Sequence, residues 1–319
     1  MPTRLGGGCK ARKNSLPCAI FQNLGIKEMF RRLGVVPMSE FQTTIIVPAH
    51  NEEAVIARTL SSLLREAKPK EFEVIVICNG CDDRTAETVR RMFSTVDVIE
   101  LKAASKTAAI NAGLRAARGT NTLLLDADIE IETSAVRALV NALKAPAIEA
   151  AIGHMTIDVQ GASWPVRAFF RVWSRHPYLR NGKFAAVIAL SKDAVKRIGQ
   201  LPHVVADDTY LRRQFSIESI AVVNEVSFRV RVPRTLSALI RVRSRVHRGN
   251  RQLDRLMPAA TDTRQEPASD LAWEVLSRPT LWVDALWYLV ASIAARLLAR
   301  VDGESWGRDL TSRQAISRR

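Results

Sequence analysis

The chain has 319 residues, of which 47% are hydrophobic and 25% are charged, and these values exclude a disordered protein and fit one large or two medium globular domains. The net charge of +15 is concentrated at the ends, since residues 1–40 hold seven Lys or Arg against two acids and residues 229–319 hold seventeen Arg against nine acids. Such basic ends indicate that the protein binds an anionic phospholipid surface. We expect no nucleic-acid partner, because the ends lack nucleic-acid-binding signatures. The alternative is that the charge serves only to keep the protein soluble.

From residue 43 onward, short apolar runs alternate with segments whose apolar residues recur at helical spacing. The predicted strands of this half are residues 43–48, 73–78, 96–101 and 122–126, and the predicted helices are residues 52–65, 83–93 and 105–118. Strands that alternate with helices of this length indicate an α/β fold with a mostly parallel sheet flanked by helices. Ligands of such sheets bind beyond the carboxyl ends of the strands.

The second half is less regular. Its predicted strands are residues 150–159, 183–190, 220–223 and 227–232, and its predicted helices are residues 191–198 and 207–215. Residues 164–178 are a candidate for either a membrane-facing helix or an acceptor-side core, because three arginines share one helical face and aromatic residues lie elsewhere. The predicted division is a basic extension 1–40, a main domain 41–235, a basic helical segment with linker 236–266, and a hydrophobic helix with basic tail 267–319.

The most hydrophobic window is residues 281–299, whose only charged residues are Asp284 and Arg296. Its uncharged centre, residues 285–295, would span about 16 Å as a helix, short of the roughly 30 Å of a bilayer core. Trp282, and other aromatic residues near it, suit the headgroup region. We therefore predict a helix that lies in the interface in preference to one that spans, at the cytoplasmic face of the cell membrane. Residues 1–40 lack the apolar core of a secretory signal.

Four cysteines, Cys9, Cys18, Cys78 and Cys81, are too few for a disulfide scaffold in a chain of this length. The spacing of Cys78 and Cys81 is that of a redox or zinc pair, but a zinc site would need two more well-spaced ligands. We expect reduced, cytosolic thiols.

Two carboxylates, Asp126 and Asp128, follow the apolar run that begins at residue 122. Residues two apart in an extended strand point the same way, so these acids would repel each other unless a cation joined them. Mg²⁺ and Mn²⁺ prefer carboxylate oxygens and take further ligands from substrate phosphates. A solvated turn at the strand end is the alternative reading. Lys106, near a helix N-terminus, is well placed for phosphate.

Polar residues also follow the first two predicted strands, at residues 48–53 and 79–83. Three such loops and a lysine that meet in one crevice would make a site for a nucleoside diphosphate and a metal. The sequence has no GxGxxG after the first strand and no GxxxxGK[ST], which argues against a dinucleotide-dependent dehydrogenase and a P-loop ATPase.

These motifs, in this order, resemble those of family-2 glycosyltransferases over about residues 43–215. The matching segments are Val47-Pro-Ala-His-Asn-Glu-Glu53, Asn79-Gly80 with Asp83 and Thr85, Lys106 through Asn111-Ala-Gly113, and Asp126-Ala-Asp128. The resemblance implies a GT-A fold, here followed by a helical, membrane-associated C-terminal extension. It also implies a nucleoside-diphosphate sugar as donor, with UDP as the expected nucleotide, and an acceptor hydroxyl that a lipid could carry.

The resemblance also implies a role for each matching residue. Nucleotide-binding residues would be Pro48, His50, Glu52, Asn79, Asp83, Lys106 and Asp126. Asp128 would hold Mg²⁺ or Mn²⁺ on the diphosphate, with Asp126 nearer the ribose. The family commonly has Asp where this chain has Asn79, which leaves the preferred base open.

Enzymes of this family invert the anomeric carbon and need a general base, which the family places in an acid–Asp pair at the start of a later helix. Asp207 and Asp208 match this pair, so the resemblance makes Asp208 the base. Adjacent carboxylates in a closed cleft can raise one another's pKa toward the working range. A pair of acids that merely favours the first turn of a helix is the alternative.

The Gln-x-x-Arg-Trp motif of the processive members is absent after this point, which predicts transfer of a single sugar. His247 or Arg248 could instead clamp the departing diphosphate, and a basic, lipid-facing helix is an equal alternative. Two rival functions stay open, a nucleotidyltransferase of a related fold and a non-catalytic nucleotide-binding protein at the membrane. The first would need a glycine-rich loop with an arginine after the first strand, where the chain has Pro48-Ala-His-Asn51.

Overall fold

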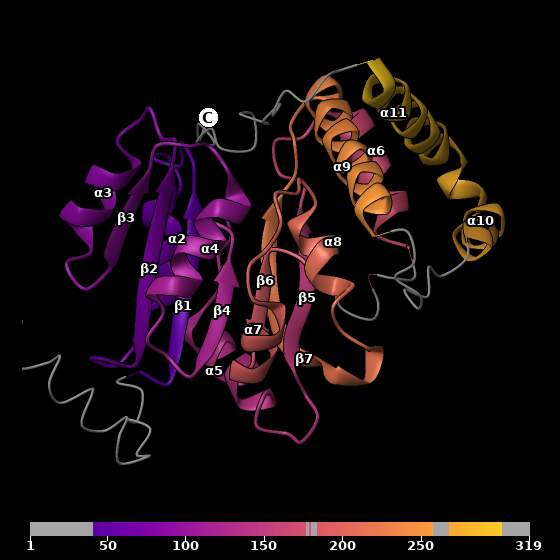
Figure 1. The fold of residues 1–319 in the computed structure, drawn as a ribbon. Coiled ribbons are helices and arrows are strands. Elements are labelled where there is room, and N and C mark those ends of the chain that lie inside the picture. Colours follow the sequence, from indigo (N-terminus) through magenta and orange to yellow (C-terminus); the bar gives the residue numbers. More distant parts are fainter. Residues whose placement is uncertain (1–40, 177–178, 180–183, 258–267, 302–319) are drawn as a thin grey trace, which may run out of the picture. The chain divides into compact units, whose positions relative to one another are not determined.

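The computed structural model describes residues 41–176, 179, 184–257 and 268–301 (Figure 1). The predicted extension 1–40, the linker 258–267 and the tail beyond residue 301 lie outside the described residues, as do Cys9 and Cys18.

Seven strands form one sheet in the order β3-β2-β1-β4-β6-β5-β7. The strands are β1 Thr43–Ala49, β2 Phe72–Asn79, β3 Asp97–Leu101, β4 Asn121–Leu125, β5 Ala150–Asp158, β6 Val187–Leu190 and β7 Ile220–Arg231. The first four are parallel, β6 runs antiparallel to both of its neighbours, and β5 and β7 are parallel to each other. The predicted fold class, a mostly parallel sheet flanked by helices, is confirmed.

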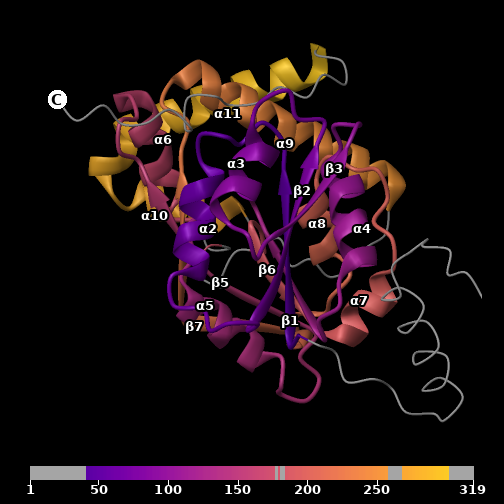
Figure 2. The ribbon, with the colours of Figure 1, turned by 90° about the vertical axis from the view of Figure 1, so that its left-hand side faces the viewer.

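Helices cover both faces of the sheet. Side chains point alternately to the two faces of a strand, and those of the buried strands are apolar on both faces, so each face needs a covering layer. Ile45 and Val47 of β1 point into a core beneath one set of helices, and Ile46 points into a core beneath the other. Figure 2 shows α2 and α5 on one side of the strands and α4 and α7 on the other. These helices, with α3 on the first face and α8 on the second, are α2 Ile56–Leu64, α3 Thr85–Met92, α4 Lys106–Ala116, α5 Thr133–Ala142, α7 Lys192–Ile198 and α8 Asp207–Arg212.

Two elements differ from the prediction. Helix α5 is absent from the predicted elements, although Val136, Leu139 and Val140 are buried at helical spacing. For β7 the sequence predicts two strands, residues 220–223 and 227–232. The structure has one strand, whose pairing with β5 shifts from Ile152–Val222 to His154–Ser227. The pairing is irregular between these positions, where four residues of β7 lie opposite one residue of β5, and the strand continues beyond them.

A third hydrophobic core lies between α6 Trp164–Trp173, α9 Leu236–Leu256 and α11 Trp282–Val301. The sequence allowed residues 164–178 to be either core or membrane-facing, and Phe169 and Trp173 lie in this core. The other helical elements here are α10 Ala268–Leu276 and the short 3₁₀ helices η2 Ile217–Ser219 and η3 Pro279–Leu281. In Figure 1, α9, α6 and α11 lie together, with α10 beside α11.

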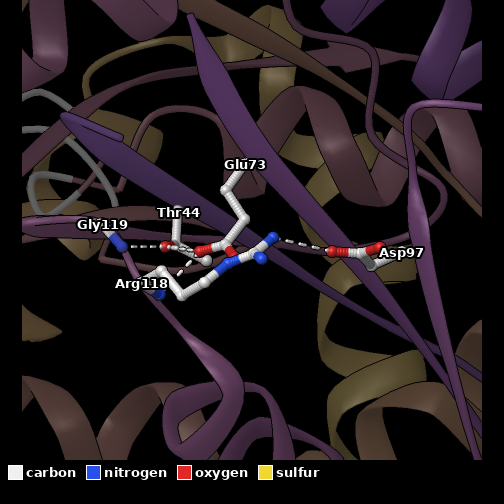
Figure 3. A network of polar contacts seen from close by, with 5 residues as sticks. All are labelled: Thr44, Glu73, Asp97, Arg118 and Gly119. Atoms are coloured by element: carbon white, nitrogen blue, oxygen red, sulfur yellow. Dashed lines mark hydrogen bonds and ion pairs between the residues drawn. The ribbon is translucent and has the colours of Figure 1, made fainter. Parts of the chain in front are cut away.

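A buried carboxylate joins three strands and the turn before β4 (Figure 3). Glu73 of β2, 3% exposed, accepts hydrogen bonds from the Thr44 hydroxyl of β1 and from the Arg118 guanidinium, and the Arg118 backbone N–H lies 2.7 Å from Glu73 Oε2. Arg118 also reaches Asp97 of β3 (3.2 Å), and the Gly119 N–H donates to Thr44 Oγ1 (2.8 Å). A buried charge is tolerated only when it is paired and hydrogen-bonded, as here.

Glu73→Gln should lower the free energy of unfolding by about 2 kcal/mol, because it removes hydrogen bonds to a buried charged group. Urea unfolding followed by circular dichroism measures the change. Glu100→Gln is the matched control, since Glu100 of β3 makes only an exposed ion pair with Arg90 (2.7 Å) and should change stability by less than about 0.5 kcal/mol. Equal midpoints for the two variants would contradict a stabilising role for this network.

Candidate active site at the carboxyl ends of the parallel strands

Lys106 joins three segments that are far apart in the sequence. Ser105 caps α4 by accepting a hydrogen bond from the Ala108 N–H (3.3 Å), so the helix begins at Lys106, one residue after the predicted start. The Lys106 ammonium lies 2.7 Å from Asp126 Oδ1, just after β4, and 3.0 Å from Asp207 Oδ2 at the start of α8. Burial disfavours the charge of Lys106, but Asp126 and Asp207 outweigh it, and the pKa of Lys106 is raised above its ordinary value. Lys106 is therefore a fixed cation in this cluster.

A hollow opens beside this cluster, at the carboxyl ends of β1 and β4. Five of the predicted site residues line it, namely Pro48, Lys106, Asp126, Asp207 and Asp208. The fold therefore brings together residues from the end of β1, the turn after β4 and the acid pair at the start of α8, as expected. His50, Asn79 and Asp128 are not among the lining residues.

The two acids of α8 differ in their surroundings. Asp207 is buried and bound to Lys106. Burial raises the pKa of Asp207, and the neighbouring Lys106 acts in the opposite direction. Asp208 is less buried and lines the hollow, and its Oδ1 accepts a hydrogen bond from the Thr209 N–H (2.7 Å). Asp207 is thus engaged as an ion-pair partner, while Asp208 lines the small hollow beside the cluster.

Helix α9 holds the loop that leads into this acid pair. Gln252 accepts from the Val205 N–H (3.0 Å) and donates to the His203 carbonyl (3.2 Å). At Gly249 the helix backbone approaches so closely that an added Cβ would lie 3.1 Å from Ala206. An isolated glycine within a helical pattern is the one sequence signal that could have identified this contact. Gln252 and Gly249 were not among the predicted site residues.

The loops after β1 and β2 contact each other. His50 Nδ1 lies 2.6 Å from the Asn79 carbonyl, and Asn79 Nδ2 donates to the Ala49 carbonyl (2.8 Å). Asn79 Oδ1 is buried and has no hydrogen-bond partner among the described residues. Gly80 has a φ of +59° and packs against Ala104, so a side chain at this position would clash. The two loops therefore present a buried acceptor in a fixed position.

Glu52 and Asp83 hold these same loops in shape. Asp83 accepts from the Thr85 N–H and the Glu53 N–H, both at 3.0 Å, and from the Thr85 hydroxyl at 2.5 Å. The Glu52 N–H donates to the Thr85 hydroxyl (2.8 Å), and the Glu52 carbonyl accepts from the N–H of the two residues that lead into α2. The turn explains why α2 begins at Ile56 and not at residue 52. A direct contact of Glu52 or Asp83 with a nucleotide stays a prediction.

Asp126 and Asp128 do not lie on an extended strand. Strand β4 ends at Leu125, and a turn follows in which the Ile129 N–H donates to the Asp126 carbonyl (3.2 Å). The expectation that both carboxylates point the same way because the backbone is extended is therefore wrong. Asp126 contacts Lys106, whereas Asp128 lies near Arg58 of α2, whose pKa is lowered chiefly by burial and raised by Glu130 and Asp128.

The predicted diphosphate clamp is not brought to the hollow, since neither His247 nor Arg248 lines it. Burial and three nearby arginines, Arg243, Arg296 and Arg251, lower the pKa of His247, which keeps the imidazole neutral at neutral pH. Arg248 Nη1 lies 3.4 Å from Ser244 Oγ on the same helix. The clamp role stays a prediction.

The pair Cys78 and Cys81 consists of free thiols. A hydrogen bond between them lowers the pKa of Cys81 to about 7 and raises that of Cys78. The Asn51 N–H donates to Cys81 Sγ at 3.4 Å, so Cys81 also helps to join the loops after β1 and β2. Within the described part of the chain no group of three or more His, Cys, Asp or Glu could hold a metal ion alone.

Comparison with known proteins supports one family. The sequence model of glycosyl transferase family 2 matches residues 44–190. The probable glycosyltransferase YdaM of Bacillus subtilis (strain 168) is 32% identical over 107 residues, which are 31% of this chain and 26% of that protein. The dolichyl-phosphate beta-glucosyltransferase ALG5C of Trichomonas vaginalis is 37% identical over 101 residues, 28% of this chain and 30% of that protein. The chain thus spans about a quarter to a third of the length of these relatives.

Among solved structures, the mannosyltransferase PcManGT from Pyrobaculum calidifontis, in complex with GDP-Man and Mn²⁺, superposes with a TM-score of 0.55. The match covers 88% of this chain and 83% of that chain at 20% sequence identity, so it supports a shared fold. Residues 44–190 thus match glycosyl transferase family 2, and the domain that contains them has a GT-A fold.

Proposed function

We propose that this chain is an inverting glycosyltransferase that moves one sugar from a nucleoside-diphosphate sugar to an acceptor hydroxyl. The observation that carries the proposal is the Lys106 bridge, which joins Asp126 at the end of β4 to the acid pair at the start of α8. A donor site and a general base must lie within one reaction distance of each other for such a transfer. Asp126, which belongs to the proposed donor site, and Asp208, the proposed base, line the same hollow.

The proposed donor site includes the loops after β1 and β2. Asn79 Oδ1, a buried acceptor that lacks a partner among the described residues, suits a base that presents a ring N–H, as uracil and guanine do. Lys106 at the start of α4 would neutralise a phosphate. We propose a UDP-sugar as the first candidate and keep a GDP-sugar as the second, because PcManGT was solved with GDP-Man.

The donor set after β4 fits Mg²⁺ or Mn²⁺. Asp126 and Asp128 offer carboxylate oxygens, and no third His, Cys, Asp or Glu joins them among the described residues. Two carboxylates suffice for these ions when the diphosphate and water supply the other ligands. The ion would neutralise the charge that develops on the diphosphate as it leaves.

Asp208 is the proposed general base. It would take the proton of the acceptor hydroxyl while the acceptor oxygen bonds to the anomeric carbon and the bond from that carbon to the diphosphate breaks. Attack from the face opposite the leaving group inverts the anomeric carbon. Asp207 would hold the start of α8 through Lys106 and leave Asp208 to face the acceptor. We further propose that the reaction takes place at the cytoplasmic face of the membrane, with an acceptor that a lipid could carry.

A donor screen tests this function. UDP-, GDP- and dTDP-sugars are added to the full chain with Mn²⁺, with Mg²⁺ or with EDTA, and the melting temperature is measured. At a hundred times its dissociation constant, one donor should stabilise the fold by about 2.7 kcal/mol, or about 5–10 °C, only when the metal is present. Release of the nucleoside diphosphate is then followed with that donor. Stabilisation without turnover would favour a non-catalytic nucleotide-binding protein, and no stabilisation by any donor would contradict the proposal.

A further inference from the structure

Helices α10 and α11 carry an exposed apolar surface that nothing in the described part of the chain covers. We call it the outer face, and each of its members is at least 41% exposed. Its members are Trp273, Leu276, Trp282, Val283, Leu286, Leu289, Val290, Ile293, Leu297 and Val301. On α11 they recur every three or four residues, so they form one stripe along the whole helix. Contiguous apolar surface of this kind marks an interaction site.

The opposite side of α11 is fastened to the domain. Ala291, Ala295 and Ala299 are buried and let α11 approach its neighbours closely, and Tyr288 stacks on Phe169 of α6 with 5.1 Å between ring centroids. Asp284, 5% exposed, forms a bidentate pair with Arg171 of α6, with both contacts at 2.6 Å. Arg251 of α9 donates to the Ala299 carbonyl at the other end. Contacts at both ends thus hold the helix.

These contacts decide between lying on a membrane and spanning it. The helix from Pro279 to Val301 is long and apolar enough to cross a bilayer by composition. To do so it would have to leave α6 and α9 and carry Asp284 into hydrocarbon without Arg171. The loss of one partner of a buried ion pair is costly, because the other charge is left unpaired. The fastened helix can therefore meet a membrane only with its outer face.

The charges on α11 select the kind of surface. Apart from the buried Asp284, the charged residues of the helix are Arg296 and Arg300, and both are exposed. Arg300 lies on the stripe near its C-terminal end, and Arg296 lies along its edge. Trp273 and Trp282 are exposed near the other end, and tryptophan favours the headgroup region. Apolar residues flanked by cations and tryptophan match an anionic phospholipid interface.

We propose that the outer face of α10 and α11 binds in the plane of an anionic phospholipid bilayer, with α11 parallel to the membrane. Helix α9 then connects the membrane to the site, because Arg251 contacts α11 while Gly249 and Gln252 hold the loop before Asp207. This surface would hold the chain at the cytoplasmic face of the membrane, where we propose that the transfer takes place. Bilayer binding does not itself require the proposed reaction, and the two can fail separately.

Sedimentation with lipid vesicles tests the proposal. The full chain is mixed with vesicles of phosphatidylcholine alone or of phosphatidylcholine with 30% phosphatidylglycerol. Binding to the anionic vesicles should be at least about tenfold tighter than to the neutral ones. The double variant Leu286→Glu with Ile293→Glu should lose at least about tenfold in binding, because it places two carboxylates in the middle of the stripe. Unchanged binding of this variant would overturn the proposal.

The matched control is Met92→Glu with Ile217→Glu, two exposed apolar residues on α3 and η2. It adds the same charge elsewhere and should bind vesicles about half as tightly as the wild type or better. Circular dichroism melts show whether each variant is folded. Fluorescence quenching by brominated lipids should be stronger for bromine near the headgroups than at the bilayer centre, and the reverse order would show a spanning helix. A lipid-free dimer that the stripe variant dissociates, without vesicle binding by the wild type, would assign the face to a second copy of the chain.

Discussion

Asp208→Asn should reduce sugar transfer by about 10²–10⁴-fold and leave the dissociation constant of the donor unchanged, because an amide cannot accept the proton of the acceptor hydroxyl. Asparagine keeps the size of the side chain and can still accept the hydrogen bond that the Thr209 N–H donates to Asp208 Oδ1 at 2.7 Å. The loss should therefore appear in kcat and not in the affinity for the donor. Initial rates of nucleoside-diphosphate release and calorimetric titration measure the two quantities.

Two further variants separate the base from its neighbours. Asp193→Asn removes an exposed acid from the first turn of α7 and should leave both rate and affinity unchanged. Asp207→Asn removes the buried charge that pairs with Lys106 and should lower the melting temperature as well as the rate, because Lys106 keeps its charge and loses one of its two anionic partners. If Asp207→Asn were a stable protein that binds donor but does not react, while Asp208→Asn stayed active, the roles of the two acids would be reversed.

The first half of the fold could be predicted because each element has a strong local signal. In β1, Ile45, Ile46 and Val47 are all fully buried, and a continuous apolar run is what a strand covered on both faces requires. Helix α4 begins at Lys106, one residue after the predicted start, because the Ser105 side chain caps it. In β7, by contrast, the sequence predicts two strands, but pairing with β5 on both sides of an irregular segment makes them one strand. That pairing is a tertiary effect that local sequence does not contain.

The candidate site could be predicted in its residue types but not in its contacts. The sequence identified Lys106, Asp126 and Asp207 separately, and the structure adds that the lysine joins the two acids. Nothing in the spacing predicted that Asp126 and Asp128 would lie in a turn, because that turn depends on where β4 stops. The support that Gln252 gives to the loop before Asp207 comes from 47 residues away along the chain. Such long-range positioning follows only from the packed fold.

The same reasoning applies to the C-terminal helix. Composition alone favoured an interfacial helix at residues 281–299 but left a full span open. The deciding observation is the buried pair of Asp284 with Arg171, because it fixes which face of α11 belongs to the protein. The charged residue Asp284 in the apolar window therefore shows which face of α11 packs on the protein, but only its pairing with Arg171 of α6 makes this clear.

Asp128→Ala should weaken binding of the nucleoside diphosphate in Mn²⁺ by about 100-fold, because one of two carboxylate ligands is lost. In EDTA the wild type and the variant should bind the nucleotide equally weakly, since the proposed role of Asp128 acts through the metal. Calorimetric titration with UDP, with and without Mn²⁺, gives the four constants that are needed. Asp193→Ala, at an exposed acid of α7, is the matched control and should keep the full effect of Mn²⁺.

The competing role for Asp128 is that of an electrostatic neighbour of Arg58. In that case Asp128→Ala would lower the melting temperature and would change nucleotide affinity by the same factor in Mn²⁺ and in EDTA. A metal ligand instead gives a difference between the two conditions that disappears in the variant. The ratio of the affinities with and without Mn²⁺ therefore separates the two roles even if the variant is less stable. An unchanged ratio would remove Asp128 from the metal site and leave Asp126, bound to Lys106, without a second carboxylate.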